Sequence, residues 1–236
     1  LGDSVCVQYA ESEFPQQGWG YYMQEQFESG ANVSNRAVGG TSTKTYQTLG
    51  YWEKAIAQIE EGDFVLINFG LNDFYNISET GKGTTIEQYK ENLTMYCNEI
   101  FKKNATPVLV TPLPECKTSS VPALKERGEA MKEVGASIGV TVIDMNTALV
   151  EQWLTDSTGT VTEAQCTKAF EQYYLSEAAF LRLEKEYGKT VSDAKWEYIK
   201  NTPDRTHINI DGATFFAETL CGFLKETDLR IADYLK

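Results

Sequence analysis

The stretch DFVLINFGLND (63–73) places a short, apolar and partly β-branched segment directly before a polar turn. A run of this length and composition is typical of a buried strand. Two more runs have the same character, TPVLVTP (106–112) and VTVIDM (140–145), and NVSNRAV (32–38) is a weaker fourth. The sequence therefore predicts a sheet built from these runs.

Segments with apolar residues at helical spacing separate and follow the predicted strands. The clearest is TTIEQYKENLTMYCNEIFKK (84–103), and the same spacing occurs in TKTYQTLGYWEKAIAQIEE (43–61), ALKERGEAMKEVGASI (123–138) and DGATFFAETLCGFL (211–224). Strands that alternate with helices favour a parallel sheet covered on both faces, which is an α/β fold.

Two parts of the chain do not fit this alternation. Residues 146–203 form a long helical excursion whose many aromatic residues we interpret as helix packing rather than as a substrate wall. At the other end, the chain opens on LGDS (1–4) without a preceding apolar run. If Gly2-Asp3-Ser4 ends a strand, most of that first strand is absent from the sequence. Because no repeat or linker interrupts residues 1–236, we expect one domain.

Composition limits the partners. A net charge of −13 and a pI near 4.6 argue against nucleic acid or an anionic membrane. No apolar run approaches the roughly 18 residues of a membrane span, and no signal-peptide pattern occurs. Both an extracellular and a cytoplasmic location are therefore compatible with the sequence. The sequence does not indicate an oligomeric state. The five cysteines lack C-x-x-C spacing, so we expect buried small hydrophobic side chains rather than a zinc site.

Polar turns follow several of the predicted strands, where open α/β sheets form their ligand crevice. These turns are Gly2-Asp3-Ser4, VGGTS (38–42) and GLND (70–73), and PDRTH (203–207) precedes the last helix. We expect the four segments to converge on one edge of the sheet. PDRTH contains the only histidine of the chain, which excludes a histidine-rich metal site.

Ester hydrolysis needs a hydroxyl nucleophile, a base, a group that orients the base, and donors for the oxyanion. Ser4, His207 and Asp204 fill the first three roles. The backbone N–H groups of Ser4 and Gly40 and the side-chain amide of Asn72 supply the donors. Each of these residues taken singly is more often structural, so the ordered set carries the prediction.

A competing motif, GASIG (135–139), matches the G-x-S-x-G nucleophile elbow. The elbow requires a strand before the serine and a helix after it, and here the order is reversed. We therefore expect Ser137 near the C-terminus of a helix that Gly139 ends, and we reject it as a nucleophile.

The ordered set resembles the SGNH (GDSL-type) hydrolase family, which is named for Ser, Gly, Asn and His in separate sequence blocks. The matching residues are Gly2-Asp3-Ser4, Gly40, Gly70-Leu71-Asn72-Asp73 and Asp204-Arg205-Thr206-His207. The resemblance implies a three-layer α/β/α sandwich with a mostly parallel, flavodoxin-like sheet. It also implies Ser4 as nucleophile, His207 as base, Asp204 as its partner, an oxyanion hole of Ser4, Gly40 and Asn72, and no metal or cofactor.

Within that family the chain looks most similar to the rhamnogalacturonan acetylesterase group, which deacetylates pectin-type polysaccharides. That group often has Arg after the block-two glycine and His before the block-three asparagine, where this chain has Thr41 and Leu71. A polyanionic substrate would need local cations on so acidic a protein. Arg36, Lys44 and Arg205 lie in the matching blocks and either bind substrate or form surface salt bridges.

The sequence thus predicts a serine esterase that removes acetyl groups from a carbohydrate, with a pectin-type or other plant polysaccharide as the expected substrate. One alternative is an SGNH esterase or lipase for another short acyl ester. The other is a non-catalytic flavodoxin-like module that binds a sugar or nucleotide. No G-x-x-x-x-G-K or G-x-G-x-x-G sequence follows a predicted strand, so phosphate binding is disfavoured.

Overall fold

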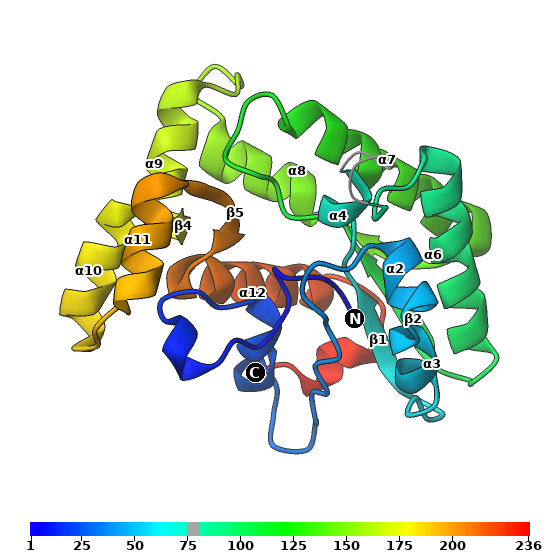
Figure 1. Cartoon of the computed structure of the whole chain (residues 1–236). Helices are drawn as coiled ribbons and strands as arrows, with labels where there is room; N and C mark the ends of the chain where they lie inside the picture. The colour runs from blue at the N-terminus through cyan, green and yellow to red at the C-terminus, as the bar shows by residue number, and fades with distance from the viewer. Residues whose placement is uncertain (75–80) are drawn as a thin grey trace. The chain divides into compact units, whose positions relative to one another are not determined.

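The computed structural model describes residues 1–74 and 81–236 and contains two compact units. The first unit comprises Leu1–Ser4, Arg36–Leu113 and Pro122–Thr147, and the second comprises Val5–Asn35, Pro114–Val121 and Ala148–Lys236. Each unit has a sheet of its own (Figure 1). Each also has a buried apolar cluster. Whether residues 1–236 behave as one domain stays a prediction.

The first unit alternates strands and helices as the sequence predicts. In chain order its elements are α2 (Thr43–Thr48), α3 (Tyr51–Ile56), β1 (Phe64–Ile67), α4 (Leu71–Phe74), α6 (Ile86–Phe101), β2 (Thr106–Val110), α7 (Val121–Ile138), β3 (Thr141–Ile143) and α8 (Met145–Leu149).

The three strands of the first unit form a parallel sheet in the order β1-β2-β3. The chain start extends this sheet beside β1. Leu1 N donates to Leu66 O at 2.7 Å, Asn68 N donates to Leu1 O at 2.9 Å, and Gly2 bridges Asn68 in parallel. Gly2-Asp3-Ser4 therefore leaves the sheet at the carboxyl end of the strands, where the sequence predicts it.

Two local predictions differ from the structure. The helix expected over 43–61 is two helices, because Gly50 takes a left-handed φ of +76° between α2 and α3. The weak strand expected over 32–38 does not form, and the segment contributes a hydrogen bond from Val38 N to Gly2 O at 2.9 Å. Its alternating apolar residues are too few to bury one face.

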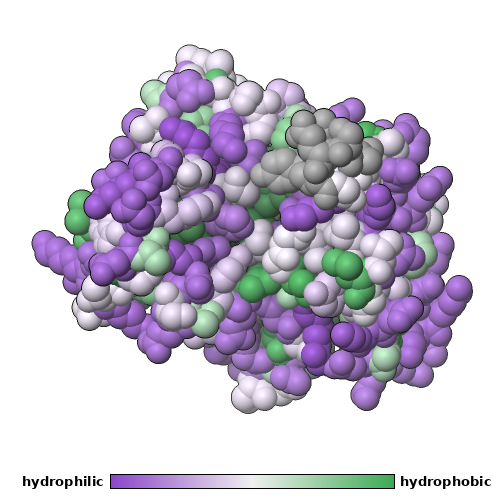
Figure 2. Space-filling model, viewed as in Figure 1, coloured by the Kyte–Doolittle hydropathy of each residue, from purple (hydrophilic) through white to green (hydrophobic). Residues whose placement is uncertain are grey.

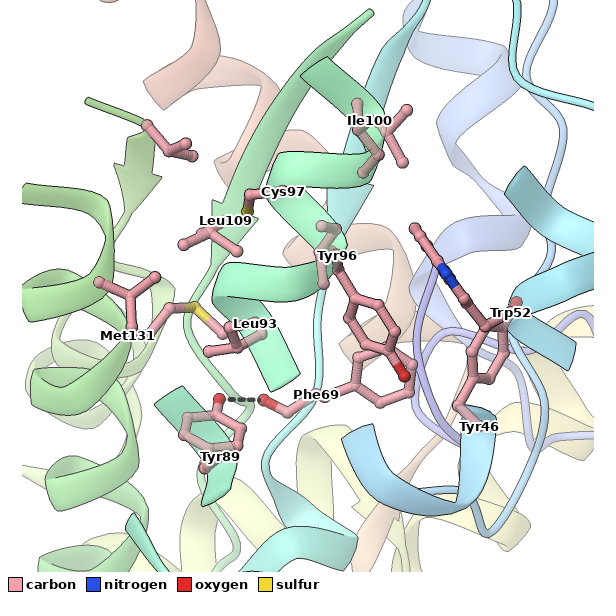
Figure 3. Close-up of a cluster of buried hydrophobic side chains, with 14 of the residues drawn as sticks. Tyr46, Trp52, Phe69, Tyr89, Leu93, Tyr96, Cys97, Ile100, Leu109 and Met131 are labelled. Carbon is pink, nitrogen blue, oxygen red and sulfur yellow. Dashed lines mark hydrogen bonds between the residues drawn. The ribbon is translucent and has the colours of Figure 1, made fainter. Parts of the chain in front are cut away.

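Aromatic side chains pack together with aliphatic ones in the core of the first unit (Figure 3). Phe69 contacts the rings of Tyr46 and Tyr96, with centroids 5.2 and 6.3 Å away. Buried tyrosines need a partner for their hydroxyl, and here the partners are carbonyls of residues just before two of the polar turns. Tyr46 donates to Arg36 O at 2.7 Å and Tyr89 donates to Phe69 O at 2.7 Å. The core thereby anchors the segments that the site prediction depends on.

The second unit is mainly helical. In chain order its elements are η1 (Glu11–Glu13), η2 (Trp19–Tyr21), α1 (Met23–Gln26), the π-helix η3 (Val150–Leu154), α9 (Glu163–Tyr173), β4 (Tyr174–Leu175), α10 (Glu177–Tyr187), α11 (Asp193–Asn201), β5 (Asp204–Ile208), α12 (Ile210–Lys225) and η4 (Arg230–Tyr234).

Most of the excursion over 146–203 is helical, as expected, but it also contains β4, which pairs antiparallel with β5. The expected polar turn PDRTH is therefore mostly strand. Asn209 holds the junction after this strand: its side chain caps α12 through Gly212 N at 3.1 Å, and its amide donates to Gln172 O and Tyr174 O at 2.9 and 3.0 Å. This buried junction sets where β5 ends and α12 begins.

The surface agrees with the acidic, polar composition. Hydrophilic residues cover most of the face in Figure 2, with apolar residues scattered among them. The five cysteines are buried as free thiols, which confirms their expected role as small core residues. Within residues 1–74 and 81–236, no helix has the length and apolarity needed to cross a membrane.

The contact between α7 and β3 gives a stability prediction. A Cβ on Gly135 would overlap the Val142 side chain and lie 2.7 Å from Val140 O, whereas a Cβ on Gly128 of the same helix would meet Thr111 at an ordinary 3.7 Å. We expect Gly135→Ala to lower the free energy of unfolding by about 1–3 kcal/mol. Gly128→Ala should leave it unchanged or raise it by up to about 1 kcal/mol.

Urea unfolding of the two variants measures the difference. Equal unfolding midpoints for the two alanine variants would contradict the close approach of α7 to β3.

Candidate active site

Asp204 and His207 form a pair within β5. His207 Nδ1 lies 2.8 Å from Asp204 Oδ2, and Asp204 Oδ1 accepts the backbone N–H groups of Thr206 and His207 at 3.1 and 2.9 Å. The carboxylate is thus held by the backbone of the segment that carries the imidazole. Asp204 is 7% exposed and the His207 side chain is 30% exposed, so the orienting group is enclosed while the ring reaches solvent.

Asp204 stays ionised. Burial alone would raise the pKa of this carboxyl. The hydrogen bond from the His207 ring, the charge of that ring and the two backbone N–H groups outweigh burial and bring the pKa below its usual value. An ionised carboxylate at Nδ1 fixes the tautomer in which Nε2 carries no proton and can accept one.

The helical excursion also reaches this carboxylate. Tyr198, on α11, places its hydroxyl 3.4 Å from Asp204 Oδ2, the oxygen that His207 contacts. This contact links α11, the last helix of the excursion, to the carboxylate of the Asp204–His207 pair. Tyr198 was not identified from the sequence, because its place six residues before Asp204 carries no motif.

Side-chain contacts of Arg205 and Thr206 hold β5 in place within the second unit. Arg205 donates from Nη1 to Cys116 O at 2.8 Å, and its guanidinium lies 4.6 Å from the Phe170 ring centroid. Thr206 donates from its hydroxyl to Glu115. The guanidinium of Arg205 is therefore engaged by protein groups, and a role in substrate binding stays a prediction.

The predicted oxyanion donors lie in the first unit. Gly40 has a φ of +74°, which a glycine adopts without strain, and the turn is closed by the Thr41 hydroxyl on Val38 O at 2.7 Å. A Cβ on Gly39 would lie 3.9 Å from Ser4 Cβ. The structure thus brings the glycine turn and Ser4 together, with Ser4 only 8% exposed.

Asn72 lies in the short helix α4, which begins four residues after the end of β1, and is 7% exposed. A Cβ on Gly70 would approach the Pro112 ring to 2.8 Å, so the chain can enter α4 at this point only with a glycine. The polar turn expected at GLND is therefore a helical turn, and Asn72 is held by the end of the sheet.

Two of the three predicted cations belong to the first unit. The exposed Arg36 donates to the side chain of Gln58, and the half-buried Lys44 donates to Gly81 O at 3.3 Å. A further cation of this unit was missed from the sequence: Lys82 Nζ lies 3.3 Å from the position of a Cβ on Gly40. Lys82 follows no motif, and only the fold reveals that it approaches the glycine turn.

The rejected serine lies where expected. Ser137 is in the last turn of α7, and its hydroxyl donates to Val134 O at 2.8 Å. Gly139 follows with a φ of +71° and ends the helix. Across the part of the chain that the structure describes, no group of three or more His, Cys, Asp or Glu is arranged to hold a metal ion.

The Asp204–His207 pair gives a prediction about proton position. We expect neutral His207 to carry its proton on Nδ1, because Asp204 Oδ2 accepts there. Asp204→Asn introduces an amide that can donate to Nδ1, so the proton should move to Nε2. Long-range ¹⁵N NMR reads the tautomer directly, since the chain has a single imidazole.

Asp211→Asn is the matched control, because that carboxylate pairs with Arg182 at 2.5 Å and lies four residues after His207. A native Nε2–H tautomer, or the same shift in both variants, would contradict the prediction.

Comparisons with known proteins agree with the predicted family. A model of the GDSL-like lipase/acylhydrolase family matches residues 1–163. The rhamnogalacturonan acetylesterase RhgT of Bacillus subtilis (strain 168) is 31% identical over 149 residues, which are 61% of this chain and 62% of that protein. The probable rhamnogalacturonan acetylesterase YesY of the same organism is 29% identical over 147 residues, 61% of this chain and 67% of that protein. The chain thus matches less than two thirds of the first relative's length.

Solved structures show a related fold. The B. subtilis protein YXIM superimposes on 97% of this chain and 56% of its own with a TM-score of 0.71 and 20% identity. A catalytic mutant of Axe2, an acetylxylan esterase from Geobacillus stearothermophilus, superimposes on 72% of this chain and 89% of its own with a TM-score of 0.51 and 20% identity. These likenesses confirm the predicted α/β fold of SGNH hydrolases. With the family match covering residues 1–163, the chain belongs to the GDSL-like lipase/acylhydrolase family.

Proposed function

We propose that this protein is a serine esterase that removes acetyl groups from a carbohydrate. Ser4 is the nucleophile, His207 the base and Asp204 the group that orients the base. Membership of an acylhydrolase family supports an ester hydrolase, and the names of two relatives support acetylated carbohydrate as the substrate class.

The observation that carries the proposal is the Asp204–His207 contact of 2.8 Å. The family model matches residues 1–163, so this pair lies outside the matched region and supports the proposal independently. A buried carboxylate with a lowered pKa against a partly exposed imidazole is the arrangement that a histidine base requires.

In the first half of the proposed reaction, Ser4 Oγ attacks the acyl carbon while His207 Nε2 accepts the hydroxyl proton. The backbone N–H groups of Ser4 and Gly40 and the amide of Asn72 stabilise the oxyanion that forms on the carbonyl oxygen. The bond to the sugar oxygen then breaks, and His207 returns the proton to that oxygen. The products are the free sugar hydroxyl and an acetyl ester on Ser4.

In the second half, water attacks the acetyl-Ser4 carbonyl and His207 accepts one of its protons. The same three donors stabilise the second tetrahedral intermediate. Its collapse releases acetate and returns the proton to Ser4 Oγ. Asp204 remains ionised throughout and stabilises the imidazolium in both halves.

A pectin-type polysaccharide is the finer proposal for the substrate. Two relatives are named for rhamnogalacturonan. Lys82 places an ammonium group beside the Gly40 turn, and Lys44 Nζ donates to Gly81 O, next to Lys82 in the chain. These charges offset the acidity of the protein where an acidic sugar would approach. Arg36 and Arg205 donate to protein groups as well, and we include both among the proposed substrate-binding residues.

The first activity prediction concerns the two reacting groups. Ser4→Ala and His207→Ala should each lower acetate release by at least about a thousandfold, because each variant lacks one of the two groups between which the proton moves. Acetate is measured from a small activated acetyl ester and from acetylated pectin oligosaccharides.

Ser137→Ala is the control, since this serine of the G-x-S-x-G sequence should have no catalytic role. Equal rates for the native protein and Ser4→Ala would refute the proposal. If the native protein cleaves the activated ester but releases no acetate from the oligosaccharides, only the pectin-type substrate is refuted.

The second activity prediction concerns pH. The rate should fall as acid protonates His207, because imidazolium cannot accept the Ser4 proton. Asp204 has a lowered pKa and stays ionised above about pH 5, so this loss belongs to the imidazole, which ordinarily titrates near pH 6.5. A profile of kcat/KM over about pH 5–8 tests the assignment, and NMR titration of the single imidazole should give the same midpoint. A flat profile contradicts a histidine base.

A further inference from the structure

The two proposed oxyanion donors outside the nucleophile turn come from different segments. Gly40 precedes α2, and Asn72 lies in α4 after β1. An oxyanion hole works only if its donors keep a fixed spacing, and an error of about 1 Å can cost about a hundredfold in rate. Something must therefore hold α2 against α4.

The carboxylate of Asp73 makes this connection. It accepts the backbone N–H of Thr43 at 3.0 Å on Oδ2, and on Oδ1 it accepts the hydroxyls of Thr43 and Thr84 at 2.6 and 2.8 Å. Asp73 follows Asn72 directly, and Thr43 is three residues after Gly40. One side chain thus joins the helical turns that present the two donors.

Further contacts fix both sides of this carboxylate. Arg127, from α7, donates from Nη2 to Asp73 O and to Thr84 O, each at 2.8 Å. Asn92 donates to the Thr43 hydroxyl at 3.0 Å, and Tyr96 donates to Thr43 O. Each contact ends on Asp73 or on a residue that touches it, so the network closes on itself.

The network is dry. Asp73 and Thr43 are 0% exposed, Thr84 is 3% exposed and Arg127 is 7% exposed. Burial raises the pKa of Asp73, while the hydrogen bonds from Thr43 and Thr84 and the charge of Arg127 act in the opposite direction. Hydrogen bonds in such surroundings are stronger than in water, and removing one partner leaves a buried group without its bond.

We propose that Asp73, with Thr43 and Thr84, is a positioning residue that sets the spacing between the Gly40 and Asn72 oxyanion donors. This inference rests on the proposed esterase function. It predicts that breaking the network lowers kcat by more than the accompanying loss of stability explains.

Two matched substitutions separate these roles. Thr43→Val removes the hydroxyl that donates to Asp73. Thr111→Val removes an equally buried hydroxyl of the same unit. This hydroxyl donates to Asp144 Oδ1 at 3.1 Å and accepts the backbone N–H of Asn146 at 2.7 Å, and neither partner belongs to a donor turn. We expect similar losses of stability for the two variants. We expect kcat to fall about 10- to 100-fold for Thr43→Val, with KM within about twofold, and to stay within about twofold for Thr111→Val.

Thr43→Ser restores the hydroxyl without the methyl group, so it should recover most of kcat. If Thr43→Val does not fold, Thr84→Val removes the other hydroxyl on Asp73 Oδ1 and should lower kcat in the same way. Equal kcat for Thr43→Val and Thr111→Val, or a Thr43→Ser variant as slow as Thr43→Val, overturns the positioning role. Native activity in Ser4→Ala instead overturns the esterase function, and the positioning role with it.

Discussion

The hydrogen bonds onto the Asp73 carboxylate are the constraint on which the first unit depends most. They join a helix that starts after the glycine turn to a helix that starts four residues after the end of β1. Neither helix exceeds six residues, so neither is stable by itself. Tertiary contacts must hold them, and a buried carboxylate with three donors supplies those contacts with fixed directions. The aromatic core supplies the remaining anchors through its hydroxyl groups.

In the second unit, a different set of contacts holds Asp204 and its strand in place. Asp204 is held by backbone N–H groups of its own segment, and its strand is fixed by pairing with β4 and by the capped start of α12. The proposed base is therefore oriented by local geometry, whereas we propose that a network of residues from several helices sets the spacing of the oxyanion donors. The two parts of the proposed site differ in how far along the chain their support extends.

The parts of the fold whose signal is local could be predicted from the sequence. The three strong strands and α6, α7 and α12 follow from apolar periodicity, and their bounds differ from the prediction by a few residues. The interruption at Gly50 and the strand at Asp204–Ile208 were missed, because a glycine within a helical pattern and a charged strand in a two-stranded sheet give weak signals. Arg127 and Lys82 were also missed, since their partners lie far away in sequence.

The short distance along the chain between Asp204 and His207 bears on how such a protein can change over evolutionary time. Since the acid–base pair is completed within four residues, segments inserted upstream of it can vary in length without altering the geometry of the pair. Residues 146–203 lie upstream of the pair and contact its segment at two places, through the pairing of β4 with β5 and through the Tyr198 hydroxyl 3.4 Å from Asp204 Oδ2. Changes of length elsewhere in these residues can therefore alter the surface of the protein while the geometry of the Asp204–His207 pair is kept.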